Sequence, residues 1–169
     1  MQIGLHLPRR FFAIARTFLL YKWRTGLLGS YVEIHSKRFL GTKNAFFHNR
    51  VNIMYGCRIE TISHYGGKKY SPRLILKEGV VIGQNSYITC AESIVIGRNT
   101  VLTSNVTITD QVHEHLLVDK PGYEPTITKK VEIGDNCLIY NNAVILPGTK
   151  LGDYCVVGAN SVIKGHFSQ

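Results

Sequence analysis

The chain has 169 residues, of which 44% are hydrophobic and 18% charged, a composition that fits one globular domain and excludes disordered or collagen-like chains. Its 20 Lys and Arg against 11 Asp and Glu give a formal net charge of +9, so we expect attraction to polyanions or anionic cofactors. The four cysteines form no Cys-x-x-Cys pair, which argues against a zinc knuckle and favours free thiols in a reducing, cytoplasmic compartment.

Residues 7–24 are predicted to form an amphipathic helix. Apolar residues recur there at steps of three and four: Leu7, Phe11, Ile14, Phe18 and Tyr21. Arginines and Thr17 gather on the opposite arc. A basic, aromatic helix of this kind either packs as a lid on the end of the fold or lies on a membrane surface, and we favour the lid. No apolar run near this end is long enough to span a bilayer.

After the helix, the dominant pattern is a six-residue repeat. Its aliphatic positions are Leu76, Ile82, Ile96, Leu102, Ile133, Ile139, Ile145, Leu151 and Val157. The fourth residue after each is small or β-branched, and the residue directly after is often Gly. Six residues make one short strand and one bend, so three units close a triangular coil, and coils stack at roughly 4.8 Å. We predict a prism with the aliphatic residues inside and Gly relieving backbone strain at the bends.

A weaker frame of the same repeat precedes this one. It consists of Phe47, Ile53 and Ile59, with an extension upstream to Ile34 and Leu40. The repeat is interrupted by an exposed loop at residues 64–73 and by two extra residues between Ile88 and Ile96.

The longest interruption is the loop at residues 109–130. Long loops in compact domains are usually functional. We therefore divide the chain into an N-terminal cap at residues 1–30 and a repeat domain at residues 31–165 that extrudes this loop.

The loop carries the candidate chemistry, because side chains fill the interior of a prism and leave no cleft there. His113 and His115 are its only side chains suited to general-base work near neutral pH, although each could be a solvated loop residue. Asp110 could orient an imidazole or simply form the turn that starts the loop, and we favour the turn.

The repeat, the segment Asn105–His113 (NVTITDQVH) and the segment Val131–Gly165 resemble the left-handed β-helix, or hexapeptide-repeat, acyltransferases. Within that family the chain is most similar to the sugar and polysaccharide O-acetyltransferases related to the galactoside and maltose enzymes. The resemblance is strong over residues 74–164 and weak over 31–63. It implies an all-β fold, a left-handed parallel β-helix with a short N-terminal helix and one long extruded loop.

The resemblance also implies a function. It is direct acetyl transfer from acetyl-CoA to a hydroxyl of a sugar, polysaccharide or lipid-linked glycan, without a metal, in a homotrimer whose sites lie between protomers. His113 corresponds to the general base, and the backbone amide of Asn141 to the oxyanion donor. Asn141 and Ala159 correspond to residues along the coenzyme, and Lys164 to a phosphate ligand.

Two residues depart from the family pattern near the coenzyme groove. Tyr140 replaces a Gly, and Gly165 stands where a Lys is expected, so Lys164 takes the phosphate role only with a shift of one residue.

Other functions stay open from sequence alone. One is a zinc enzyme similar to the γ-class carbonic anhydrases, for which His64, His113 and His115 are the plausible ligands. Another is a non-catalytic trimeric scaffold. We expect no nucleic-acid binding, because the aromatic residues do not interleave with the basic ones. A cytoplasmic protein with peripheral contact at the inner face of the membrane also remains open.

Overall fold

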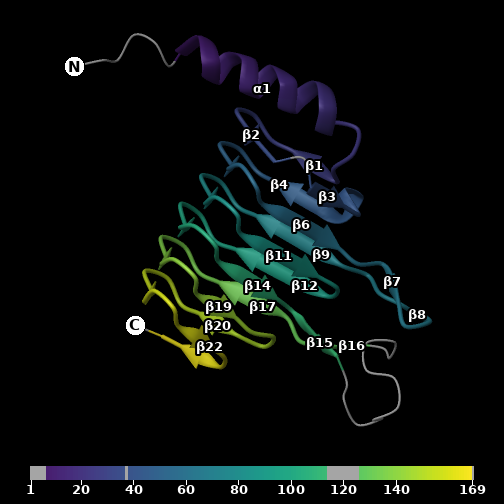
Figure 1. The fold of residues 1–169 in the computed structure, drawn as a ribbon, viewed down its shortest axis with the longest axis vertical. Coiled ribbons are helices and arrows are strands. Elements are labelled where there is room, and N and C mark those ends of the chain that lie inside the picture. The colour runs from purple at the N-terminus through teal and green to yellow at the C-terminus, as the bar shows by residue number, and fades with distance from the viewer. Residues whose placement is uncertain (1–6, 37, 114–125, 169) are drawn as a thin grey trace.

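The computed structural model describes residues 7–36, 38–113 and 126–168. Its body is a three-sided column of parallel strands, with one helix across the N-terminal end (Figure 1). The three sheets have seven, six and six strands, and hydrogen-bonded neighbours in each sheet come from successive coils. The predicted prism of triangular coils is confirmed.

The first face of the column is the seven-stranded sheet: β1 (Leu27–Leu28), β4 (Ala45–Phe47), β9 (Arg73–Leu76), β12 (Ser93–Ile96), β17 (Val131–Ile133), β20 (Lys150–Leu151) and β23 (His166–Phe167). The second face contains β2 (Glu33–Ile34), β5 (Asn52–Ile53), β10 (Val81–Ile82), β13 (Val101–Leu102), β18 (Leu138–Ile139) and β21 (Val156–Val157). The third face contains β3 (Arg38–Leu40), β6 (Arg58–Thr61), β11 (Tyr87–Cys90), β14 (Thr107–Thr109), β19 (Val144–Ile145) and β22 (Val162–Ile163).

Three corners join these faces. Corner I leads from the first face to the second, corner II from the second to the third, and corner III from the third back to the first in the next coil. The three-residue 3-10 helix η1 (Thr42–Asn44) forms corner III in the first coil.

The core confirms the repeat. All nine aliphatic residues of the main frame are buried, and so are Phe47, Ile53 and Ile59 of the weaker frame. Leu40 was assigned to the inside, and this is wrong because 59% of it is exposed. Phe39 pairs with the buried Ile59 in register and points inward instead, so β3 is displaced by one residue from the six-residue frame.

The glycines after the aliphatic positions have a different role from the predicted one. Gly97 and Gly134 do not have a positive φ, so they relieve no strain there. A Cβ at Gly97 would instead collide with the backbone of Gly134 in the next coil, so these glycines allow the corners to stack closely. The left-handed conformation falls two residues later, on Asn99 (φ 52°) and Asn136 (φ 57°), because Asn tolerates that region better than most residues.

The helix α1 (Leu7–Tyr21) ends three residues earlier than predicted and presents an unexpected face to the column. Thr17, assigned to the polar arc, is buried and accepts the backbone N–H of Ile34 at 2.9 Å. Phe11 and Phe18, assigned to the apolar stripe, are exposed. The predicted packing face is therefore only partly right: Tyr21 of the apolar stripe is buried and packs on Phe39, but polar contacts such as that of Thr17 also hold the helix to the column. Within the described residues, no helix is long and apolar enough to cross a membrane.

Two antiparallel hairpins extend from corner III (Figure 1). The first pairs β7 (His64–Tyr65) with β8 (Lys68–Lys69), so residues 64–73 contain a hairpin where a loop was predicted. The second pairs β15 (Gln111–His113) with β16 (Thr126–Thr128) and forms the base of the predicted long loop. His115 lies outside the described residues.

Candidate functional site

His113 is the last described residue of β15, and its side chain is exposed. The Tyr65 ring, from the other hairpin, meets the imidazole edge-on, with 5.3 Å between the ring centroids and 62° between the planes. The two hairpins of corner III thus bring together residues 48 positions apart. Sequence reasoning selected His113 but missed Tyr65, because no spacing rule connects the two interruptions of the repeat.

Hydrogen bonds fix the base of the His113 hairpin. The Tyr70 hydroxyl accepts the backbone N–H of Thr126 at 2.8 Å, which ties the region of the first hairpin to the second. The Gln111 side-chain amide donates to Thr89 Oγ1 on the column at 3.0 Å and accepts from Thr126 Oγ1 at 3.2 Å. His113 is therefore carried on a ribbon anchored to both the column and its neighbouring hairpin.

Asp110 is fully buried at the point where the His113 hairpin leaves the column. Its Oδ1 accepts the backbone N–H of Ala91 at 2.7 Å, and its Oδ2 accepts those of Glu92 and Ser93 at 2.8 Å each. These three amides belong to the coil with two extra residues. The corner there is irregular, and the Asp110 carboxylate supplies the acceptors for its backbone N–H groups. Burial raises the pKa of Asp110, and these amide bonds oppose the increase. Both carboxylate oxygens are thus engaged with backbone, which supports the structural interpretation of Asp110 over an imidazole contact.

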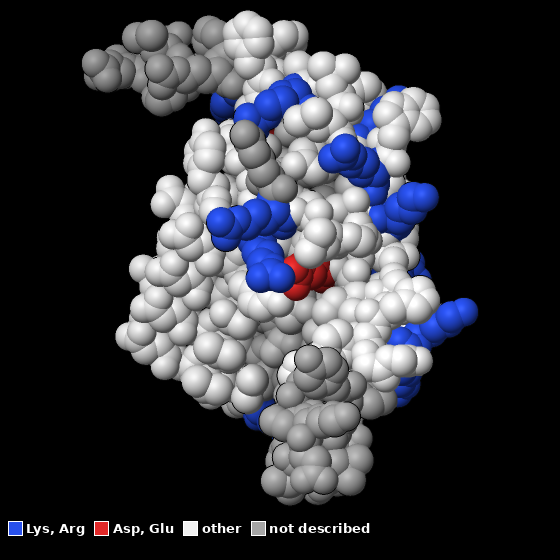
Figure 2. All heavy atoms as spheres, turned by 45° about the vertical axis from the view of Figure 1, so that its right-hand side comes forward, with Lys and Arg blue, Asp and Glu red and all other residues white. Residues whose placement is uncertain are grey.

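A basic hollow of about 520 Å³ lies on corner III toward the C-terminal end of the column. It is lined by Glu92, Thr128, Lys129, Lys130, Pro147, Gly148, Lys150, Lys164, Gly165 and His166. Four lysines around one hollow give it a positive potential that attracts anions, although Lys150 also pairs with Glu132 at 3.2 Å. More widely, the face of the molecule drawn in Figure 2 carries many Lys and Arg side chains and one small patch of Asp or Glu side chains. Lys164 therefore lies beside three other lysines, Lys129, Lys130 and Lys150.

Asn141 and Ala159 lie on corner II, one coil apart. The backbone carbonyl of Asn141 accepts the N–H of Asn160 at 2.9 Å, so the two bends are stacked. In the described part of the chain, the amides of Asn141 and Ala159 donate to no other backbone group, which leaves two N–H groups for a ligand. Tyr140, the departure from the family pattern, is 43% exposed beside them.

The candidate residues do not converge within one chain. His113 and Lys164 are on corner III, whereas Asn141 and Ala159 are on corner II, and the third face lies between the two corners. A groove containing all four therefore needs corner III of one copy to face corner II of another.

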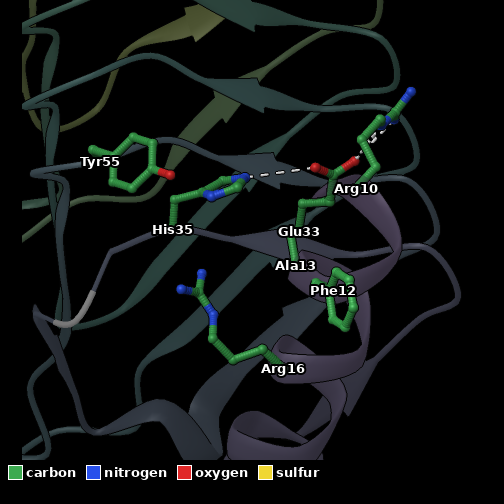
Figure 3. A pocket seen from close by; sticks show the side chains of 7 residues that line it. All are labelled: Arg10, Phe12, Ala13, Arg16, Glu33, His35 and Tyr55. Atoms are coloured by element: carbon green, nitrogen blue, oxygen red, sulfur yellow. Dashed lines mark hydrogen bonds and ion pairs between the residues drawn. The ribbon is translucent and has the colours of Figure 1, made fainter. Parts of the chain in front are cut away.

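A second cavity, of about 460 Å³, lies between α1 and the second face (Figure 3). It is lined by Arg10, Phe12, Ala13, Arg16, Glu33, His35 and Tyr55. Glu33 accepts Arg10 Nε at 2.9 Å, and its other oxygen is 3.5 Å from His35 Nε2. Because these charged groups contact one another across the junction, the cavity is best explained as the docking joint of the helix.

No group of three or more His, Cys, Asp or Glu residues is placed to hold a metal ion among the residues that the structure describes. Three cysteines, Cys57, Cys90 and Cys137, are buried, and Cys155 is half-buried. Burial and the neighbouring Asp110 charge raise the pKa of Cys90, so its thiol is a poor nucleophile.

Family comparisons agree with the fold. Residues 130–165 match the family described as bacterial transferase hexapeptide (six repeats), and residues 74–110 match the hexapeptide repeat of succinyl-transferase. The column is thus a left-handed β-helix built from hexapeptide repeats, as the sequence predicts.

One similar protein is WbbJ of Escherichia coli K12, which is named as a lipopolysaccharide biosynthesis O-acetyl transferase. The two are 34% identical over 104 residues, 57% of this chain, and the match spans about half (53%) of the relative. The predicted resemblance to the sugar O-acetyltransferase branch is confirmed.

Solved structures show the same architecture. AntD, an N-acyltransferase from Bacillus cereus, has a TM-score of 0.74 at 17% identity, covering 89% of this chain and 79% of AntD; that structure contains dTDP-4-amino-4,6-dideoxyglucose and coenzyme A. A maltose O-acetyltransferase from Clostridium difficile 630 has a TM-score of 0.52 at 19% identity, covering 95% of this chain and 78% of its own.

Proposed function

We propose that this chain is an acetyl-CoA-dependent O-acetyltransferase that modifies a hydroxyl of a sugar, polysaccharide or lipid-linked glycan. The observation that carries the proposal is the arrangement on corner III, where the anchored His113 and the four-lysine hollow lie along one edge of the column. The names of WbbJ and of the maltose enzyme support a sugar acceptor, and the AntD complex supports a coenzyme A ligand.

In this proposal His113 acts as general base. Its neutral imidazole takes the proton of the acceptor hydroxyl as the oxygen attacks the acetyl thioester carbonyl. The tetrahedral intermediate then collapses with cleavage of the carbon–sulfur bond, and the imidazolium returns the proton to the leaving thiolate. No acyl-enzyme is needed, because both substrates are held side by side.

The remaining groups bind the donor. The amide of Asn141 donates to the oxyanion of the intermediate, and the Ala159 amide contacts the pantetheine arm. Lys164 contacts the coenzyme phosphates, with the other lysines of the hollow beside it. Lys129 and Lys130 follow the second strand of the His113 hairpin, and Lys164 lies two coils further along the column. Strands of adjacent coils are about 4.8 Å apart, so Lys164 lies roughly 10 Å below the coil from which that hairpin extends, a spacing that an extended coenzyme can bridge.

In the same proposal the chain forms a homotrimer with sites between protomers, and the separation of the candidate residues over two corners supports a site shared between copies. Three-fold symmetry places corner III of each copy against the same surface of its neighbour, so every seam can contain a complete site. In this view residues 31–165 form the transferase domain and residues 1–30 its cap, and the protein works in the cytoplasm.

Purified chain should release coenzyme A thiol from acetyl-CoA only when a suitable sugar is present. We expect His113→Ala to lower kcat by about 10² to 10⁴ while coenzyme binding, measured by calorimetry, is unchanged. His48→Ala is the matched control, because His48 is exposed on corner I and should retain full activity. Near-complete activity of His113→Ala would contradict its role as base.

Mixed oligomers test whether the site is shared. We expect Ala159→Trp, which blocks corner II, to be inactive like His113→Ala. Refolding the two in equal amounts should restore about a quarter of wild-type activity, since half of the protomers retain His113 and half of their neighbours retain Ala159. Activity that stays at the level of the separate variants would place the site within one chain.

A further inference from the structure

We propose that the outer face of α1 binds the surface of an anionic membrane. The carrying observation is the way this helix docks. Arg16, Thr17 and Tyr21 contact the column, while Phe18, Leu19 and Trp23 are left exposed. This inference is independent of the proposed transferase activity.

Hydrogen bonds hold the inner side of the helix to the column. Arg16 Nη2 donates to the backbone carbonyl of Ile34 at 2.7 Å, and the Tyr21 hydroxyl donates to that of Ser36 at 3.0 Å. Together with the Thr17 and Arg10 contacts, these bonds fix the rotation of the helix about its axis. The outward face is therefore a fixed property of the fold.

That outer face is apolar and aromatic. The exposed apolar residues of the helix and of the turn after it are Phe11 (69%), Phe12 (70%), Phe18 (49%), Leu19 (76%), Leu20 (50%) and Trp23 (84%). Of these, Phe11 and Phe12 border cavities between the helix and the column. At 100° per residue, Leu19 and Phe12 point opposite Thr17 and Tyr21. Phe11 and Phe18 lie on one flank of that arc, and Leu20 lies on the other. Several large apolar side chains exposed together on one helix mark an interaction site.

The positive charge of the helix favours an anionic membrane as the partner of its outer face. Residues 7–28 contain four Arg, one Lys and no Asp or Glu. Arg10 and Arg16 contact the column, whereas the side chains of Lys22 and Arg24 are exposed. The Lys22 ammonium lies inside the aromatic face, with its Nζ 4.5 Å from the Phe18 ring centroid and 5.6 Å from that of Trp23. A second copy would bring the same cations face to face, whereas an anionic lipid surface offers both an apolar layer and negative headgroups.

The position of the helix suits a flat partner. The helix lies across the N-terminal end of the column as its outermost described element (Figure 1). Docking on a bilayer would stand the column on this end and leave the hairpins of corner III in water.

Vesicle sedimentation of the full chain tests the proposal. We expect binding to phosphatidylcholine vesicles that contain about 30% phosphatidylglycerol, weaker binding at higher salt, and little binding to phosphatidylcholine alone. The triple variant Phe18→Gln/Leu19→Gln/Trp23→Gln should lower the partition coefficient at least about a hundredfold, at an unchanged melting temperature.

A pair of matched single substitutions controls for a general effect of making the surface more polar. Phe18 and Phe167 are similarly exposed, at 49% and 43%, and Phe167 lies on β23 at the opposite end of the column. Phe18→Gln should weaken vesicle binding about tenfold, and Phe167→Gln should leave it unchanged. The proposal is overturned if wild-type chain ignores anionic vesicles, if both single variants bind equally, or if the triple variant instead abolishes concentration-dependent self-association.

Discussion

Replacement of Asp110 separates a structural carboxylate from a catalytic one. The side chain is fully buried and accepts three backbone amides from the irregular corner at residues 91–93. In Asp110→Asn the remaining oxygen can stay with Glu92 and Ser93, while the new NH₂ group faces the Ala91 N–H. In Asp110→Ala all three amides lose their acceptor.

The contacts set the size of the effect. A buried donor left without an acceptor costs about 1–3 kcal/mol. We therefore expect Asp110→Asn to lower the free energy of unfolding by about 2 kcal/mol and Asp110→Ala by about 5 kcal/mol. For a chain of this size that corresponds to losses of roughly 4–8 °C and 10–20 °C in melting temperature.

Urea unfolding followed by circular dichroism, at one fixed protein concentration, measures these differences. Asp153→Asn is the matched control, because the exposed Asp153 also accepts a backbone amide, that of Asp135 at 2.7 Å. That change should stay within about 0.5 kcal/mol. If Asp110→Asn unfolds like wild type while kcat collapses, the carboxylate acts on the reaction and the structural reasoning is refuted.

Two further predictions concern the same corners. Gly97→Ala should cost about 2–3 kcal/mol because its Cβ meets the backbone of Gly134, whereas Gly158→Ala, whose nearest atom would be Ser161 Oγ at 3.5 Å, should be close to neutral; equal unfolding midpoints would contradict the stacking role. Because burial raises the pKa of Asp110, the native state binds more protons than the unfolded state between that pKa and the ordinary value of 3.8. The free energy of unfolding of wild type, relative to that of Asp110→Asn, should therefore rise as the pH falls through this window. If urea unfolding gives the same difference in free energy at every pH, this prediction is contradicted.

The column was predictable because its energetics are periodic. Each coil repeats one environment, so Ile82, Leu102 and Ile139 are buried for the same reason and reveal one another in sequence. Where the environment changes, the period misleads: Phe39 replaces Leu40 inside the first coil, where the stack ends.

The prediction of which side of the helix packs on the column was inaccurate for a related reason. Amphipathic periodicity assumes that apolar residues pack inward, but the second face offers polar groups at its N-terminal end, namely Glu33 and the backbone of Ile34. Arg10, Arg16 and Thr17 match these groups, which lie 17 to 23 residues away in sequence. Such a match between two elements is not visible in the pattern of either one.

The candidate site was only partly accessible from sequence. His113 stands in a conspicuous interruption of the repeat, but its neighbour Tyr65 belongs to a different interruption. The lysines of the basic hollow come from three segments, around Lys129, Lys150 and Lys164, which only the coil geometry brings together. The catalytic and coenzyme roles of these residues stay predictions.

The regularity of the column also explains why its chemistry would lie at corners. Inside, every coil is filled by aliphatic side chains, and on the faces the backbone amides are used by neighbouring strands. Corners escape both constraints: corner III accommodates inserted hairpins without breaking a sheet, and corner II leaves the amides of Asn141 and Ala159 without backbone partners in the described chain. Because the hairpin and these free amides occur on different edges of one column, a site that used His113 together with the amides of Asn141 and Ala159 would need two copies of the chain.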